Sequence, residues 1–336
     1  MVKDKIMMAH GSGGKISHEL ISKFFLPKFD NEILKKLDDS AVFEIKGNRL
    51  AFSTDSYVIN PIFFPGGDIG KLAIYGTVND IAMSGAIPLY ISVGFVLEEG
   101  LLISDLERIL KSMKDAAKQA KVLIVCGDTK VVEKGSADKI FINTSGIGVI
   151  EDKVNISGEN AKVGDLIILS GSVGDHGIAV MSERGQFEFE VEIESDCAPL
   201  SNLVQHMLSY TKKINVLRDP TRGGIAAILN EIAEKSKVSL EIYEDKIPIK
   251  KSVMGACELL GFDPLYIANE GKLITIVSKN VARGLLNHMR KHQFAKDAEI
   301  IGEVIEGKAG RVTMKTLIGS TRILDMMIGE LLPRIC

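Results

Sequence analysis

The sequence predicts a chain of two domains that mix α-helices and β-strands. Three observations predict this: a length of 336 residues, an apolar content of 46%, and the alternation of helical and strand-like segments. A chain of this length usually forms about two domains, and this apolar content is ample for a core in each. A polar tract at 151–160 separates the halves, so we place the domain boundary near it.

The composition argues against several classes of protein. A net charge of -3 argues against nucleic-acid binding. No apolar run is long enough to span a bilayer, and no long apolar region follows residues 1–5 as in a signal peptide. The four cysteines are far apart and form no CxxC pair, which excludes a zinc knuckle and a disulfide framework. We expect a cytoplasmic protein with reduced thiols.

The first half begins with a glycine-rich loop at 7–15 and a helix at 16–29. The loop holds Gly11, Gly13, Gly14 and Lys15, but it is not a Walker A motif, because Ile16 stands where Ser or Thr is required. It is either a flexible arm or a mobile lid whose N–H groups and lysine close over a phosphate. The apolar residues of 16–29 lie on one face, which predicts the helix.

Aspartates mark the edges of the next two elements. Asp39 precedes and Asp55 ends a strand expected at 49–55, where carboxylates are either turn residues or ligands of a hard metal. A helix begins after Asp68, its expected N-cap, and ends near 85–88. Asn79 and Asp80 fall within its apolar stripe. A buried Asp80 requires donors or a cation, so it is either a structural cap or a magnesium ligand.

The first half continues with a strand at 89–97, a helix capped by Ser104, a short buried strand at 122–126 and a strand at 139–149. Cys126 is expected to be a core residue. Asp128 and Lys130 follow the buried strand directly, at the position where α/β architectures place ligand groups.

The second half opens with a strand at 165–170 that runs into a glycine loop at 171–177, in which His176 is a loop residue or a ligand. Asp219 lies just outside a helix at 225–235, and Arg222 with two glycines at its first turn resembles an anion seat. Glu270 lies in a loop before a strand at 273–277. Strands at 299–304 and 311–317 and a tail from 319 follow.

The sequence ends on Cys336. A terminal residue is usually mobile, Pro333 keeps its approach extended, and the charge of Arg334 favours the thiolate. The last residues could reach about 50 Å if extended. The thiol is either an ordinary chain end or the carrier of a bound group.

Carboxylates beside glycine loops are also typical of a polyphosphate bridged by Mg²⁺.

Eight sequence blocks, in this order, resemble one family. They are HGSGG at 10–14, FSTDSY at 52–57, FPGG at 64–67, NDIA at 79–82, GDTK at 127–130, DPTRGG at 219–224, NEGK at 269–272 and PRIC at 333–336. The chain resembles the HypE family of hydrogenase maturation proteins, within the ATP-binding superfamily of aminoimidazole ribonucleotide synthetase and selenophosphate synthetase. The resemblance covers nearly the whole chain from about residue 7.

The resemblance implies a PurM-like architecture of two α+β domains. It implies an ATP-binding domain at 1–155 that pairs with a second copy to form a β-barrel core. It also implies a C-terminal α+β domain at 156–316 with ferredoxin-like character, and a mobile tail at 317–336 that carries Cys336. ATP would bind between domains or subunits.

The resemblance also implies the reaction. The carbamoyltransferase HypF would load a carbamoyl group on Cys336, ATP would drive its dehydration to a thiocyanate, and the cyanide would pass to iron on the HypC–HypD scaffold. Catalytic residues would be Cys336 with a proton acceptor among Lys130, Glu270 and His10. Residues for ATP would be Gly11, Gly13, Gly14, Lys15, Asp39, Asp55, Asn79, Asp80, Asp128 and Asp219, of which Asp39, Asp55, Asp80 and Asp219 would also hold Mg²⁺.

Three alternatives remain open at the level of sequence. Lys130 and Glu270 could form a structural ion pair instead of acting on a proton. The chain could be a synthetase of the same superfamily that acts on a free small molecule, although a selenophosphate synthetase would carry a reactive cysteine near the first glycine loop and the first cysteine here is Cys126. It could also be a non-catalytic thiol carrier, which would have no need of buried carboxylates.

Overall fold

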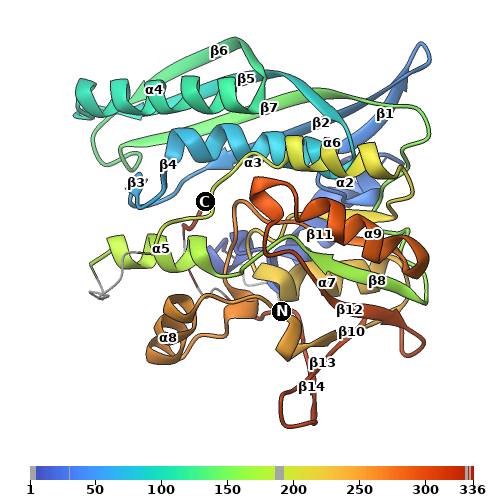
Figure 1. The fold of residues 1–336 in the computed structure, drawn as a ribbon. Coiled ribbons are helices and arrows are strands. Elements are labelled where there is room, and N and C mark those ends of the chain that lie inside the picture. Colours follow the sequence, from blue (N-terminus) through green and yellow to red (C-terminus); the bar gives the residue numbers. More distant parts are fainter. Residues whose placement is uncertain (1–4, 30, 186–192, 330–331, 333) are drawn as a thin grey trace.

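The computed structural model describes residues 5–29, 31–185, 193–329, 332 and 334–336. Two sheets organise it, one in each half of the chain (Figure 1). The five-stranded sheet has the order β1-β2-β7-β5-β6, and the seven-stranded sheet has the order β14-β13-β10-β12-β8-β11-β9. The C-terminal end lies between the two domains (Figure 1). No helix in the described ranges has the length and apolarity to cross a membrane.

The five-stranded sheet carries two helices on one face. Its strands are β1 (Ala41–Ile45), β2 (Asn48–Tyr57), β7 (Ile140–Ile150), β5 (Ile87–Glu98) and β6 (Leu123–Val132), and its helices are α3 (Ile69–Met83) and α4 (Ile103–Ala120). The chain reaches α3 through a short hairpin of β3 (Phe63–Phe64) and β4 (Gly67–Asp68). The predicted N-cap is confirmed, because the Asp68 carboxylate accepts hydrogen bonds from the Gly70 and Lys71 N–H groups.

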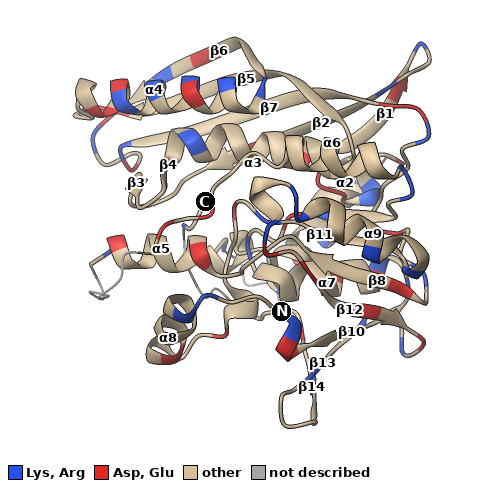
Figure 2. Ribbon diagram, in the orientation of Figure 1, with Lys and Arg blue, Asp and Glu red and all other residues tan. Residues whose placement is uncertain are grey.

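Helix α3 is buried on nearly every side. It carries few charged residues, whereas α4 carries them along its whole length (Figure 2). Gly146 and Gly148 of β7 let α3 approach the sheet closely, since a Cβ on either glycine would lie 2.6 Å from the Ile81 side chain. The α4 helix begins at Ile103, one residue before the expected cap Ser104. The resulting packing holds Asn79 and Asp80 at the junction of the two domains.

The other face of this sheet is exposed in the described part of the chain. Phe52 of β2 and Tyr90 of β5 are 42% and 45% exposed, and most of edge strand β6 is exposed. Cys126 lies on β6 and is exposed, so the prediction that it is a core residue is wrong. The sequence of this strand is apolar, which predicts burial. No second layer among the described residues covers it, so it is exposed.

The seven-stranded sheet has helices on both faces. Its strands are β8 (Asp165–Leu169), β9 (Val216–Arg218), β10 (Ser239–Tyr243), β11 (Ile274–Ser278), β12 (Glu299–Ile305), β13 (Arg311–Lys315) and β14 (Thr321–Ile323). The helices of this half are α5 (Asp175–Glu183), α6 (Ser201–Tyr210), α7 (Gly224–Lys235), α8 (Lys251–Leu260) and α9 (Lys279–Met289). Of these, α6, α7 and α9 pack on the sheet, whereas α5 and α8 pack with each other. Ile167 and Leu169 of β8 pack in the cluster of α7, whereas Ile168 packs with α6 and α9. This alternation is that of a strand buried on both faces.

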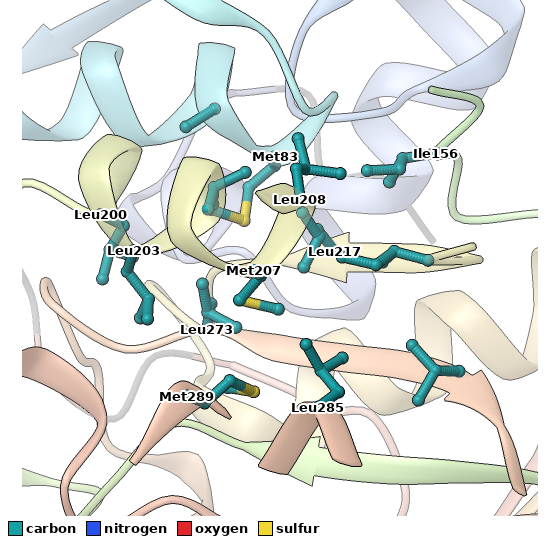
Figure 3. Packing of buried hydrophobic residues seen from close by; sticks show 14 of the residues in the cluster. Met83, Ile156, Leu200, Leu203, Met207, Leu208, Leu217, Leu273, Leu285 and Met289 are labelled. Carbon is teal, nitrogen blue, oxygen red and sulfur yellow. The ribbon is translucent and has the colours of Figure 1, made fainter. Parts of the chain in front are cut away.

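A shared core joins the two domains. Met83 at the end of α3 packs in one cluster with Leu203 and Met207 of α6 and with Leu285 and Met289 of α9 (Figure 3). The four side chains from α6 and α9 are fully buried. Burying each such side chain contributes roughly 1.5–3 kcal/mol, so this core holds the two domains in a fixed relation.

The N-terminal segment packs against the second domain. It contains short helical turns at η1 (Met8–Gly11) and η3 (Leu34–Lys36), and a helical run formed by α1 (Lys15–Leu20), the π-helix η2 (Ile21–Phe25) and α2 (Leu26–Phe29). The helix predicted at 16–29 is therefore present with a π-helical middle. The Lys15 N–H donates to the Met327 carbonyl at 3.0 Å. Further 3-10 turns are η4 (Glu244–Lys246), η5 (Pro264–Tyr266) and η6 (Gln293–Ala295).

Candidate functional site

Four aspartates that are distant in sequence meet at the domain junction. Asp39 precedes β1, Asp55 lies on β2, Asp80 lies on α3 and Asp219 follows β9. The Ser53 hydroxyl links two of them, since its Oγ lies 2.7 Å from the Asp80 Oδ2 and 3.1 Å from the Asp39 carbonyl oxygen. The structure thus brings together the four residues that the sequence singled out for magnesium and phosphate.

Burial and mutual repulsion make these carboxyls hard to ionise. Burial raises the pKa of Asp80 well above its ordinary value, and the charges of Asp219, Asp55 and Asp39 raise it further. Burial also raises the pKa of Asp219, to about 6, against the opposing effect of Arg218. Groups held together in this state need a compensating positive charge to ionise fully.

Arg218 supplies part of that charge. Its Nε lies 2.9 Å from the Asp39 Oδ1, and its Nη2 lies 2.5 Å from the Glu231 Oε2. Glu231 in turn pairs with His18 at 3.0 Å, and that partner raises the pKa of His18. The second oxygen of Asp39, Oδ2, is buried without a hydrogen-bond partner among the described residues. One oxygen of the Asp39 carboxylate is therefore engaged in an ion pair, and the other is available to bind a cation.

The chemistry of this cluster fits a hard cation, although its geometry is incomplete. Carboxylate oxygens are the ligands that Mg²⁺ takes, and Asp39 offers an unpartnered buried oxygen. No group of three or more His, Cys, Asp or Glu in the described part of the chain is arranged to hold a metal by itself. Mg²⁺ usually binds through one or two carboxylates together with substrate phosphates and water, so a nucleotide would have to complete such a site.

Glu270 is a buried carboxyl beside this cluster. It is 4% exposed, and its Oε1 has no hydrogen-bond partner in the described structure. Burial raises the pKa of Glu270 well above its usual range, as do Asp219, Asp196 and Asp55, whereas Arg222 lowers it. Burial and neighbouring carboxyls therefore favour the protonated form of Glu270, and this carboxyl can exchange a proton with a bound group.

The Asp196 carboxylate fixes the loop that carries Glu270. It accepts hydrogen bonds from the Glu270 and Gly271 N–H groups at 3.0 and 3.1 Å and pairs with Lys272 at 3.0 Å. Gly271 is required here because a Cβ would lie 1.8 Å from the Asp196 carbonyl oxygen. Two backbone N–H groups and the Lys272 ammonium of this loop thus bind one carboxylate, which fixes the backbone that carries the Glu270 side chain.

The Cys336 thiol reaches the same place. Cys336 lines a cavity of about 530 Å³ together with Gly11, Ser12, Val58 and Arg222. Burial raises the pKa of the thiol to about 12; Arg222 opposes this, and Glu270, Asp55 and Asp80 add to it. The expectation that Arg334 favours the thiolate is wrong, because the Arg334 guanidinium instead pairs with Asp138 and donates to the Val58 carbonyl.

Arg222 was noted in the sequence as part of an anion seat but was not included among the site residues. Its Nη1 donates to the Gly11 carbonyl at 2.8 Å, and Cys336 is the strongest of the groups that raise its pKa. A Cβ on Gly13, whose φ is +76°, would lie 3.0 Å from the Arg222 Cβ. The glycine loop thus packs on Arg222. The available signal was the arginine directly before two glycines at a helix start.

Two other residues of the glycine loop lie elsewhere. The His10 ring is buried and bonds locally, with its Nδ1 3.0 Å from the Met7 N–H nitrogen. Lys15 lines a separate hollow of about 1160 Å³, together with His18, Lys35 and Glu231. Gly14 packs on the chain end, where a Cβ would lie 2.5 Å from the Met327 carbonyl oxygen. In this structure neither His10 nor Lys15 lines the cavity that holds Cys336.

The remaining predicted residues have partners of their own. Lys130 pairs with Asp128 at 2.5 Å on the exposed strand β6, so the alternative of a Lys130–Glu270 ion pair within the chain is wrong. The Asn79 amide bridges the domains: its Oδ1 accepts from the Leu200 N–H at 2.7 Å, and its Nδ2 donates to the Ala198 carbonyl at 3.1 Å. Asn79 therefore orients the domains in this structure.

His176 lies at the first turn of α5 and is fully buried, so the interpretation as a loop residue is wrong. Its Nε2 lies 2.8 Å from the Ile335 carbonyl oxygen. Sequence reasoning could not find this contact, because the two residues are 159 positions apart and Ile335 offers only its backbone.

Comparisons with known proteins agree with this arrangement. Residues 37–150 match the N-terminal domain of AIR synthase related proteins, and residues 162–315 match the C-terminal domain. A carbamoyl dehydratase HypE from Bradyrhizobium diazoefficiens is 50% identical over 330 residues, covering 98% of this chain and 95% of the relative.

Two solved structures are similar over nearly the whole chain. One, of the hydrogenase maturation protein HypE in complex with ATP, has a TM-score of 0.84 at 48% identity and covers 99% of this chain and 100% of its own. The other, of a HypE–HypF complex, has a TM-score of 0.88 at 51% identity and covers 92% of this chain and 99% of its own. With two PurM-like domains, a thiol at their junction and this identity along its length, the chain belongs to the HypE family of carbamoyl dehydratases in hydrogenase maturation.

Proposed function

We propose that the chain uses ATP to dehydrate a carbamoyl group carried on the sulfur of Cys336, giving a thiocyanate. The observation that carries this proposal is the position of the Cys336 thiol, which shares a cavity with Arg222 and whose pKa responds to Glu270, Asp55 and Asp80. A side chain bound covalently to its substrate needs no separate binding step, which is the advantage of an intramolecular reaction.

The chemistry explains why these groups are needed. A thiocarboxamide has a poor leaving group in its carbonyl oxygen. Transfer of the γ-phosphoryl group of ATP to that oxygen lets it depart as phosphate, while the nitrogen loses two protons and the C≡N bond forms; the products are thiocyanate, ADP and phosphate. Phosphoryl transfer of this kind depends on positioning and on neutralising charge.

We assign a role to each residue that lies close to the thiol. Arg222 would neutralise negative charge on the activated oxygen, since its guanidinium already interacts electrostatically with the Cys336 thiol. Glu270 would accept a proton from the nitrogen in its ionised form, a role that suits a carboxyl whose pKa is raised toward the working pH. Cys336 is half-buried, which would limit the access of water to the activated group.

Magnesium would be held by Asp39, Asp55, Asp80 and Asp219 with the phosphates of the nucleotide. It would supply the positive charge that four adjacent carboxyls and a polyphosphate need in common. Gly11, Gly13 and Gly14 would contribute to the phosphate lid, as the resemblance implies. His10, Lys15, Asn79, Asp128 and Lys130 remain proposals for which a rearrangement or a second copy of the chain would be needed.

Partners and context follow from the relatives. Because a similar HypE was solved with HypF, we propose HypF as the source of the carbamoyl group and the HypC–HypD scaffold as the acceptor of cyanide. We also propose a cytoplasmic homodimer. The proposed domain division is 1–155, 156–316 and a tail at 317–336.

The test is mass spectrometry of the peptide released by cleavage after Glu330. After incubation with HypF, its carbamoyl donor and ATP, the peptide should carry a carbamoyl group that then loses one water. Cys336→Ser is the control and should show neither change. Water loss without ATP would contradict the proposal. ADP formation that persists unchanged in Cys336→Ala would point instead to a free small molecule as substrate.

A further inference from the structure

From here on, the tail means the last three residues, 334–336, and not the longer segment 317–336. These three residues are bound as an added strand would be. The Val58 N–H donates to the Cys336 carbonyl at 3.2 Å, and the Asn60 N–H donates to the Arg334 carbonyl at 3.3 Å. Val58 and Asn60 lie in the segment that follows directly on β2. The pairs 58–336 and 60–334 run in opposite directions, as in antiparallel pairing. An extended segment added to a strand in this way is a recurring mode of peptide recognition.

The middle residue of the tail is recognised on both its side chain and its carbonyl. The Ile335 side chain is 3% exposed and packs in the core of the first domain. Its carbonyl oxygen lies 2.8 Å from the His176 Nε2, and the His176 Nδ1 lies 2.8 Å from the Ser195 Oγ. A carbonyl can only accept, so Nε2 carries the proton and Nδ1 accepts from the Ser195 hydroxyl. Burial lowers the pKa of His176, which agrees with this neutral tautomer.

Arg334, the residue that precedes Ile335, is held by Arg184 and by contacts of its own side chain. Arg184 donates from Nη2 to the Arg334 carbonyl and from Nε to the Asn60 carbonyl, both at 2.8 Å. Arg334 donates from its own Nε to the Val58 carbonyl at 2.9 Å and pairs with Asp138. All three carbonyls of the tail therefore have a donor. The Ile335 carbonyl has His176 of α5, and the Arg334 carbonyl has Arg184, the residue that caps the C-terminus of α5.

We propose that His176 is a positioning residue that binds the tail through the Ile335 carbonyl and thereby sets where the Cys336 thiol lies relative to Glu270. Arg184 and the backbone of 58–60 complete the tail-binding site. The catalytic consequence rests on the proposed function; the binding itself does not. The Ile335 carbonyl belongs to the peptide bond that leads to Cys336, so a donor at this point fixes the residue that carries the reacting sulfur.

Two substitutions separate this role from a purely structural one. Glutamine at 176 can place an N–H donor near the position of Nε2, whereas asparagine can replace only the donor or acceptor at Nδ1. If His176 acts through Nε2, His176→Gln retains tail binding and His176→Asn loses it, although both remove the same ring from the core.

The experiment measures how fast iodoacetamide alkylates Cys336 in the full chain, without ATP or any partner. Every protein also carries Cys126→Ser, because that thiol is exposed. The peptide after Glu330 is followed by mass spectrometry, and the buried Cys257 serves as an internal control for general loosening of the fold. Loss of one hydrogen bond should release the tail about fivefold more often. We expect Cys336 to react about fivefold faster in His176→Ala and His176→Asn and at the original rate in His176→Gln, with Cys257 unchanged throughout.

An unchanged Cys336 rate in His176→Ala, an equal increase at Cys257, or a failure of His176→Gln to restore the original rate would each overturn the proposal. If His176→Ala does not fold, Arg334→Ala provides a second variant, since it removes the Val58 and Asp138 contacts of the tail and should also accelerate alkylation.

For the carbamoylated protein, His176→Ala should slow the ATP-dependent loss of water with the KM for ATP unchanged. If the original protein shows no loss of water, the proposed function fails while the alkylation result stands.

Discussion

Glu270 is the ionisable side chain whose environment differs most from what its sequence position suggests. The residues around it, Asn269 and Gly271, indicate only a turn before a strand. In the structure the same loop is fixed by Asp196, and the side chain lies buried among other carboxyls. Burial and the neighbouring carboxyls oppose ionisation of Glu270, so positive charge brought by a cation with ATP would favour its ionised form.

Replacing this carboxyl tests its role directly. Glu270→Gln keeps the size of the side chain but removes the proton acceptor. We expect the loss of water from carbamoylated Cys336 to slow by about 10²–10⁴-fold, the usual contribution of a general base. ATP binding should stay close to the original, as measured by calorimetry. A rate within a few fold of the original would assign proton transfer to another group.

Asp219 gives a prediction for stability against pH. Folding raises its pKa from 3.8 to about 6, so the folded state binds the proton more tightly than the unfolded state. Its carboxyl therefore contributes little penalty below about pH 4, an increasing one between about pH 4 and 6, and a constant one above. Asp219→Asn should raise the free energy of unfolding by on the order of 3 kcal/mol at pH 8 and by little at pH 4.

Urea unfolding at the two pH values measures this difference. Asp263→Asn is the matched control, because Asp263 is a half-buried carboxyl that pairs with Arg322 outside the cluster. A gain in Asp219→Asn that is equal at both pH values would mean that the carboxyl is not strained by its neighbours.

At the level of elements, local signals in the sequence predicted what local physics decides. Asp68 caps α3 because its own carboxylate reaches the N–H groups two and three residues on. The start of β6 was also predicted, but the strand continues to Val132 through residues 127–130, where a turn was expected. Its exposure was not predicted either, because exposure depends on what covers a strand. The contact of His176 with the tail could not be predicted either, because it joins residues 159 positions apart in the sequence. Asp39, Asp55 and Asp219 were found because each stands at the edge of an element, and Asp80 was found because it falls within the apolar stripe of a helix.

Helix α3 depends on one close approach to β2. A Cβ on Gly76 would lie 2.2 Å from the hydroxyl of the buried Tyr57. Gly76→Ala should therefore lower the free energy of unfolding by about 1–3 kcal/mol through overpacking. Gly255→Ala in the middle of α8 is the control, since no atom lies within 4 Å of its added Cβ and alanine favours a helix by about 0.5–1 kcal/mol. Urea unfolding of both variants should give changes of opposite sign.

At the level of the whole molecule, one face of the first sheet carries no second layer among the described residues. Phe52 and Tyr90 stand on its open face, and Leu123 and Val125 on β6 are 64% and 58% exposed. Exposed apolar area of this kind marks an interaction surface. A second copy of the chain can cover it symmetrically, which closes two open sheets into one barrel and removes the exposed edge at β6. This agrees with the dimer that the family resemblance implies.

Light scattering after size-exclusion chromatography should therefore give twice the chain mass of 36.5 kDa. Phe52→Glu should give a folded monomer, because an unpaired carboxylate buried in an apolar interface costs several kcal/mol. Leu259→Glu on α8 is the matched control, since Leu259 is 70% exposed but lies in the second domain, and it should remain dimeric. A monomeric original protein, or a Phe52→Glu variant that stays dimeric, would mean that a different partner covers this face. The Asp128–Lys130 pair lies on the same strand, so only a dimer built on this face could bring it to the site of another chain.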